Sequence, residues 1–233
     1  WRCATRARNR SFVYDATLAL LERLTSSAQL IFTSVCDAIS SKAPKNRSGR
    51  VSTSISSEPV LFRLLELYVT KLDAGSIAQV WPIISLLART MAQTTSRTVV
   101  YHALRLTTLM GTKLTDSSLF NEQRTRRDVQ DAFVRLCELT ISLYARSLDI
   151  SSGRDSDAPS VASERDETSS DTVSPISVVQ TLCSMVLPAF ITLRVDQDKI
   201  QSVSASLVYY IVAPGCRACQ GSWEREPFVV ERV

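Results

Sequence analysis

The stretch RTRRDVQDAFVRLCELTISLYARSLD, residues 124–149, decides the fold of this chain. It opens with charged residues and then places one class of side chain at steps of three and four. These positions are Val129, Phe133, Leu136, Cys137, Thr140 and Tyr144. Such steps draw a single stripe along an α-helix. The stretch therefore predicts an amphipathic helix that packs by this stripe, with its arginines at the solvent-exposed end.

The same helical period recurs on both sides of this stretch. We expect further helices over residues 11–40, 59–72, 76–92, 96–114, 176–193 and 196–212. The chain contains only 6 Gly and 8 Pro among 233 residues, and no alternating strand pattern. Pro82 lies inside one predicted helix, so that helix either kinks there or ends at Trp81 and restarts.

Several helices joined by short turns predict an all-α fold. Antiparallel helix pairs stacked as a HEAT- or armadillo-like solenoid segment are the simplest architecture, and a closed helical bundle is the alternative. The predicted organisation has five parts. They are an unstructured or artefactual start (1–10), a helical repeat-like region (11–150), a disordered acidic, Ser-rich insert (151–175), a continuation of the helical region (176–213) and an unstructured or artefactual tail (214–233).

Composition narrows the function classes. With 27 basic and 23 acidic residues the net charge is +4, which is too balanced to favour nucleic acid as a partner. No apolar run is long enough to predict a membrane-spanning helix. Three of the six cysteines, Cys36, Cys137 and Cys183, fall in apolar helical patterns and are predicted to be buried. A reducing, cytosolic compartment fits them better than a disulfide framework does, although paired cysteines remain an alternative.

The residues that could carry chemistry do not form a site. Cys216 and Cys219 have C-x-x-C spacing, but a structural zinc needs four ligands and no second pair accompanies them. His102 is the only histidine, and no nucleophile motif surrounds it. Asp128 and Asp131 share a helix face among arginines, which favours surface ion pairing. We therefore predict no enzyme activity, no metal, no cofactor and no small-molecule substrate.

The arginines Arg124, Arg126 and Arg127 are the candidate site for contact with an acidic partner or anionic lipid. The alternative is a solvated helix start with pairs four residues apart, such as Arg127 with Asp131 and Glu122 with Arg126. Basic residues at a helix N-terminus oppose the helix dipole. This mismatch favours either a binding role or a helix that begins earlier, near Ser118.

The acidic insert contains two candidate phosphorylation sites. Ser152 and Ser163 each have an aspartate three positions further on. Phosphorylation would add negative charge to a segment that has few large apolar residues to offset its ordering entropy.

Two runs of sequence resemble a known family. FNEQRTRRDVQDAFVRLCELTISLYARSLD (120–149) and LRVDQDKIQSVSASLVYYIVAP (193–214) are similar to the C-terminal region of fungal Dopey proteins, and the likeness covers roughly residues 59–214. Dopey proteins are longer than this chain, so the resemblance implies one helical section of a large protein.

The resemblance implies a non-catalytic helical scaffold on the cytoplasmic face of Golgi and endosome membranes. Its implied partners are an Arf-exchange-factor-like scaffold and an aminophospholipid flippase, and its implied roles are vesicle-mediated retrograde transport and cell morphogenesis. A peripheral module that binds anionic lipid through the basic helix start is the alternative from a different class.

Overall fold

The computed structural model describes residues 15–17, 19–20, 23, 27–40, 58–152, 173 and 175–214. The predictions for residues 1–10, for most of the insert 151–175 and for the tail after Pro214 lie outside these residues. The described elements are α3 (Ala28–Ser40), α4 (Glu58–Lys71), α5 (Ala74–Met91), α6 (Arg97–Leu114), η2 (Ser118–Asn121), α7 (Gln123–Ser152), α8 (Pro175–Thr181), η3 (Leu182–Val186), α9 (Leu187–Thr192), α10 (Gln197–Leu207) and η4 (Val208–Val212). Within the described ranges there is no β-strand, which confirms the all-α prediction.

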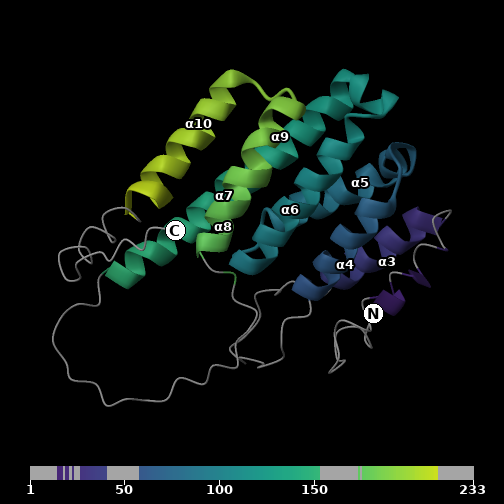
Figure 1. Cartoon of the computed structure of the whole chain (residues 1–233), viewed down its shortest axis with the longest axis horizontal. Helices are drawn as coiled ribbons and strands as arrows, with labels where there is room; N and C mark the ends of the chain where they lie inside the picture. Colours follow the sequence, from purple (N-terminus) through teal and green to yellow (C-terminus); the bar gives the residue numbers. More distant parts are fainter. Residues whose placement is uncertain are drawn as a thin grey trace, which may run out of the picture.

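The helices pack in two layers. One layer contains α3, α5, α7 and α10, because α5 packs against α3 and α7, and α7 packs against α10. The other layer contains α4, α6 and the helix formed by α8, η3 and α9, with α6 in contact with both of its neighbours. Figure 1 shows α3 and α10 at opposite ends of this stack. Successive helices thus alternate between layers, as expected for antiparallel helix pairs.

The predicted packing faces are correct where the structure describes them. In α7 all six stripe positions from Val129 to Tyr144 are buried, and Phe133 meets Phe190 of α9 edge to face at 5.0 Å between ring centroids. One continuous apolar core joins both layers from α3 to η4. Burial of such a face, rather than helix propensity, is the main source of helix stability in a folded protein.

Gly111 allows α6 to approach its neighbours closely. A Cβ atom added there would lie 3.2 Å from Val129 Cγ1 and 3.3 Å from Leu193 Cδ2. A glycine is unfavourable inside a helix by about 1 kcal/mol relative to alanine. The fold accepts this cost because the missing side chain leaves room for α7 and for the turn after α9.

Helix ends are fixed both locally and from a distance. Asp73 caps α5: its carboxylate accepts hydrogen bonds from the backbone N–H groups of Gly75 and Ser76. Residues 74 and 75 therefore belong to α5, which begins two residues before its predicted start at residue 76. Lys113 of α6 caps the C-terminal end of α4, because its Nζ donates hydrogen bonds to the carbonyl oxygens of Val69, Thr70 and Leu72.

Prolines shape three helices in different ways. Pro82 lies inside α5, yet α5 continues from Ala74 to Met91, so the helix does not end at Trp81. Pro188 and Pro214 instead follow wide π turns, η3 and η4, by two residues. A π turn has i to i−5 hydrogen bonds and opens the helix where a proline ring would clash with a carbonyl oxygen. The N–H of Leu187 accordingly donates to Leu182 O.

One cysteine prediction is wrong. Cys36 and Cys137 are buried, but Cys183 is exposed. The wide turn η3 places Leu182 and Val186 in the core, and Cys183 turns away from it.

Candidate functional site

The three predicted arginines lie together in the first turns of α7. Arg124 and Arg127 are exposed, and Arg126 is half-buried. The short helix η2 and the extended residue Glu122 precede α7, so its α-helical part begins at Gln123 and not near Ser118. None of the three guanidinium groups has an ion pair or hydrogen-bond partner within the described ranges.

The pairs expected four residues apart are not formed among these residues. Asp131 contacts Lys199 of α10, with Nζ 2.8 Å from Oδ1, instead of Arg127. Glu122 contacts Arg126 only through the backbone, where the Arg126 N–H donates to Glu122 O. The arginines are therefore available to another molecule.

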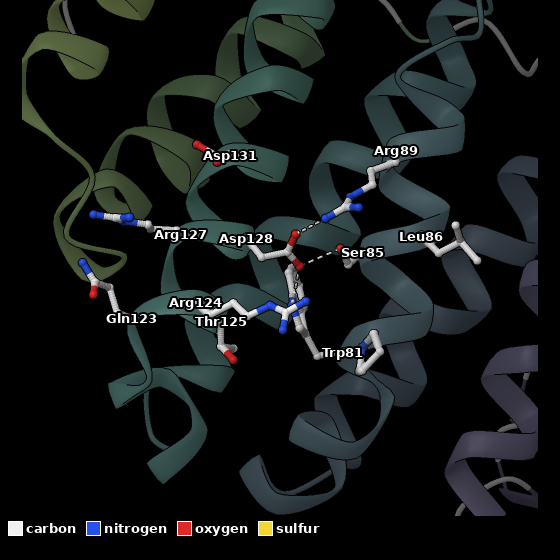
Figure 2. A pocket seen from close by; sticks show the side chains of 11 residues that line it. Trp81, Ser85, Leu86, Arg89, Gln123, Arg124, Thr125, Arg127, Asp128 and Asp131 are labelled. Atoms are coloured by element: carbon white, nitrogen blue, oxygen red, sulfur yellow. Dashed lines mark hydrogen bonds and ion pairs between the residues drawn. The ribbon is translucent and has the colours of Figure 1, made fainter.

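A groove of about 690 Å³ separates α5 from the start of α7 (Figure 2). Its α5 wall includes Pro82, Leu86 and Arg89, and its α7 wall includes Arg124 and Arg127. In Figure 2 Arg124 extends toward α5, whereas Arg127 points to the opposite side of α7. The remaining lining residues are Trp81, Ser85, Gln123, Thr125, Asp128 and Asp131.

Asp128 holds the two walls of this groove together. Its carboxylate accepts hydrogen bonds from Trp81 Nε1 at 3.2 Å and Ser85 Oγ at 2.6 Å, and it forms an ion pair with Arg89. Burial raises the pKa of the Asp128 carboxyl, but the hydrogen bonds from Ser85 and Arg89, the positive charge of Arg89 and the bond from Trp81 outweigh it and leave the pKa below its ordinary value. Asp128 thus forms an ion pair as expected, but with Arg89 of α5 and not with a neighbouring arginine of α7.

A second groove, of about 610 Å³, lies on the other side of α7, toward the start of α10. Gln130 lines this groove and connects α7 to the turn before α10. Its side-chain amide donates hydrogen bonds to Leu193 O at 2.9 Å and to Arg194 O at 2.7 Å. Arg194 has a positive φ of 52°, a left-handed conformation that is uncommon for arginine. These contacts fix the turn that presents Arg194 and Lys199 to the groove.

Together the two grooves have a positive electrostatic balance. Their cations are Arg89, Arg124, Arg126, Arg127, Arg194 and Lys199, and their carboxylates are Asp128, Asp131 and Asp196. Two of the cations, Arg89 and Lys199, are already paired with carboxylates. Sequence reasoning found the α7 arginines but missed Arg89, Arg194 and Lys199, since no local pattern connects α5 and α10 with α7.

His102 belongs to a buried polar cluster between α4 and α6. Its Nδ1 lies 3.6 Å from Glu66 Oε1, and Arg105 donates to both oxygens of Glu66 at 3.2 and 3.0 Å. Burial raises the pKa of Glu66, but the nearby His102 ring and the charge and hydrogen bonds of Arg105 lower it below its ordinary value overall. The cluster connects α4 and α6.

The other predicted sites lie outside the described residues. Ser152 is the last residue of α7, but its side chain is outside the described residues, as are Ser163, Cys216 and Cys219. Among the residues that are described, no three His, Cys, Asp or Glu side chains gather as metal ligands. No helix in that part of the chain has the length and apolar character to cross a membrane.

These features define a class of protein: an all-helical repeat-like section whose described surface has two grooves lined by basic residues. The family follows from sequence comparison. The family model described as DOP1 C-terminal matches residues 64–228, more than two thirds of the chain. The chain therefore belongs to the Dopey family. The match ends beyond Pro214, the limit expected from the resemblance. Neither a curated protein nor a solved structure matches the chain.

Proposed function

We propose that this chain is a non-catalytic scaffold section of a Dopey-like protein that acts in Golgi and endosome membrane traffic through protein–protein contacts. The observation that carries the proposal is the Dopey C-terminal match over residues 64–228. The proposed partners are an Arf-exchange-factor-like scaffold and an aminophospholipid flippase, on the cytoplasmic face of these membranes. The proposed cellular roles are vesicle-mediated retrograde transport and cell morphogenesis.

The geometry supports a binding role. Stacked helix pairs present extended surfaces without needing a closed site, and repeat proteins use such surfaces for partners. Here the layer that contains α5, α7 and α10 has two grooves, and the α7 arginines along them, Arg124, Arg126 and Arg127, have no partner within the described ranges. Unpaired arginines beside concave surfaces are well suited to protein recognition, because arginine is enriched at interfaces.

The proposed scaffold role is tested by co-precipitation. The purified chain, immobilised by a tag, should retain the exchange-factor-like scaffold from the same organism. The variant Arg124→Glu/Arg126→Glu/Arg127→Glu tests whether the basic face takes part, and Arg135→Glu, an exposed arginine further along α7, is the matched control. Failure of the unaltered chain to retain either proposed partner would overturn the proposed function.

A second function is favoured by the three unpaired guanidinium groups at the start of α7. Arg124, Arg126 and Arg127 could together attract anionic lipid at a membrane surface, at about 1 kcal/mol for each cation near the surface. Flotation with phosphatidylserine vesicles tests this reading. Salt-sensitive binding that is lost in the triple glutamate variant supports it, and equal binding by the unaltered chain and the variant contradicts it.

A further inference from the structure

We propose that the groove between α5 and α7 binds a short acidic, amphipathic segment of a partner protein. An aliphatic or aromatic side chain of that segment would cover Pro82 and Leu86, and a carboxylate of the segment would face Arg124. The inference rests on the proposed function in one respect, since it takes protein contact to be the role of this surface. It specifies the place and the chemistry of the contact.

The α5 wall provides the apolar contact. Leu86 is 67% exposed, although its neighbours Ser85 and Leu87 are buried. Pro82 is exposed one turn earlier on the same side. Residues four apart on a helix lie on one face, so the two side chains form a continuous apolar strip. Covering such a strip with a partner's apolar side chain is favourable by about 25 cal/mol per Å² removed from water.

The α7 wall provides the charge. Arg124 extends toward α5 (Figure 2), and it has no partner in the part of the chain that is described. A guanidinium group binds a carboxylate through two parallel hydrogen bonds, which makes an acidic partner the complementary one. The carboxylates of the groove do not compete strongly for Arg124, because Asp128 is held by α5 and Asp131 contacts Lys199.

The floor of the groove is preorganised. Asp128 accepts from Trp81 and Ser85, whose residues are 3% and 5% exposed, so the spacing of the walls is fixed before a partner binds. Preorganisation reduces the ordering cost of binding. Pro82 and Arg89 are seven residues apart along α5, which corresponds to about 10 Å, or two turns of a partner helix. The proposed segment is therefore short.

A membrane fits this groove less well than a protein segment does. A bilayer surface is broad, whereas these arginines line the walls of two separate grooves divided by α7. Arg124 lines only the groove toward α5, and Arg126 lines only the groove toward α10. Binding to a flat anionic surface would depend on Arg124 and Arg126 to a similar extent. A segment bound between α5 and α7 would depend on Arg124 and much less on Arg126.

The test selects peptides on the full chain. A displayed library of random peptides of about twelve residues, long enough to span roughly 18 Å as helices, is enriched on the immobilised protein. We expect enriched sequences to combine Asp or Glu with Leu, Ile or Phe. The affinity of an enriched peptide is then measured by fluorescence anisotropy. Arg124→Glu and Leu86→Asp should each weaken it by about tenfold or more, equivalent to about 1.4 kcal/mol.

Arg126→Glu is the matched control, with the same charge change two residues away, and it should weaken the peptide by less than about threefold. Circular dichroism checks that each variant is folded. Enrichment of basic or uncharged peptides, or equal losses in Arg124→Glu and Arg126→Glu, overturns the proposal. The latter pattern with phosphatidylserine vesicles assigns the arginines to a membrane. Binding of a synthetic peptide of residues 151–175 that is as tight as that of the enriched peptides assigns the groove to the acidic insert of this chain. If the chain binds the peptide but does not retain the exchange-factor-like scaffold, the groove proposal stands and that scaffold is no longer a proposed partner.

Discussion

Asp128 connects α7 to α5, and replacing it with alanine should destabilise the chain far more than an exposed aspartate on the same helix would. The substitution removes the acceptor for Trp81 Nε1 and Ser85 Oγ and the ion-pair partner of Arg89. A buried donor left without an acceptor costs about 1–3 kcal/mol. Ser85 can turn toward a helix carbonyl, but the indole N–H has no such choice. The ion pair itself adds little, because the Arg89 side chain is 66% exposed.

The expected loss for Asp128→Ala is therefore about 2–4 kcal/mol, and for Asp128→Asn, which keeps one acceptor oxygen, about 1–2 kcal/mol. Asp131→Ala is the control: this side chain is 69% exposed and contacts only Lys199, so its loss should stay below about 1 kcal/mol. The free energies of unfolding come from urea titrations followed by circular dichroism. Equal losses for Asp128→Ala and Asp131→Ala would refute the reasoning.

The pH dependence gives an independent readout of the same residue. The pKa of Asp128 in the folded chain lies below its ordinary value of 3.8. A carboxyl with a lowered folded-state pKa contributes stability that is complete above its unfolded-state value and is lost as the pH falls through the folded-state value. The difference between the unaltered chain and Asp128→Asn should therefore be constant near neutral pH and shrink below about 3.8. A difference that grows on acidification would contradict this assignment.

Three further outcomes follow from the packing. Gly111→Val should cost about 1–3 kcal/mol in a urea titration, because its methyl groups meet side chains already at contact distance; no loss would mean that this helix contact is loose. Glu66→Ala should cost about 2–3 kcal/mol, since it leaves the half-buried Arg105 without its carboxylate, and a Glu66→Gln variant that is equally unstable would show that charge is the cause. In peptide-resolved thiol labelling of the native chain, Cys183 should react and Cys36 should not, because Cys36 is buried and burial, followed by the charge of Asp37, raises its pKa to about 12; equal labelling would contradict the burial.

Sequence periodicity predicted the helices and their buried faces well, because both follow from local geometry. A residue every three or four positions lies on one face of a helix whatever surrounds it, and the stripe of α7 from Val129 to Tyr144 is buried as expected. The same reasoning failed at Cys183, where a π turn that accommodates Pro188 changes the local period. It also left Pro82 undecided, since packing on both sides of α5 determines whether a helix continues through a proline.

Partners distant in sequence could not be read from local pattern. Asp128 was matched with nearby arginines, but its hydrogen bonds go to residues more than forty positions away on α5, except for Arg89 at thirty-nine. Asp131 likewise contacts Lys199, sixty-eight positions further on. The candidate site was thus predicted in part: its three arginines were found, and the walls that turn them into grooves were not.

The sequence by itself determined that this chain is helical, where its helices lie, which faces they bury and, through two short runs, its membership of the Dopey family. These properties depend on residues within a few turns of one another or on a continuous match. Only the tertiary structure decided that α5, α7 and α10 lie side by side and that their charged residues pair across helices. Pairing depends on which helices become neighbours, and that is fixed by packing of the whole core rather than by any single segment.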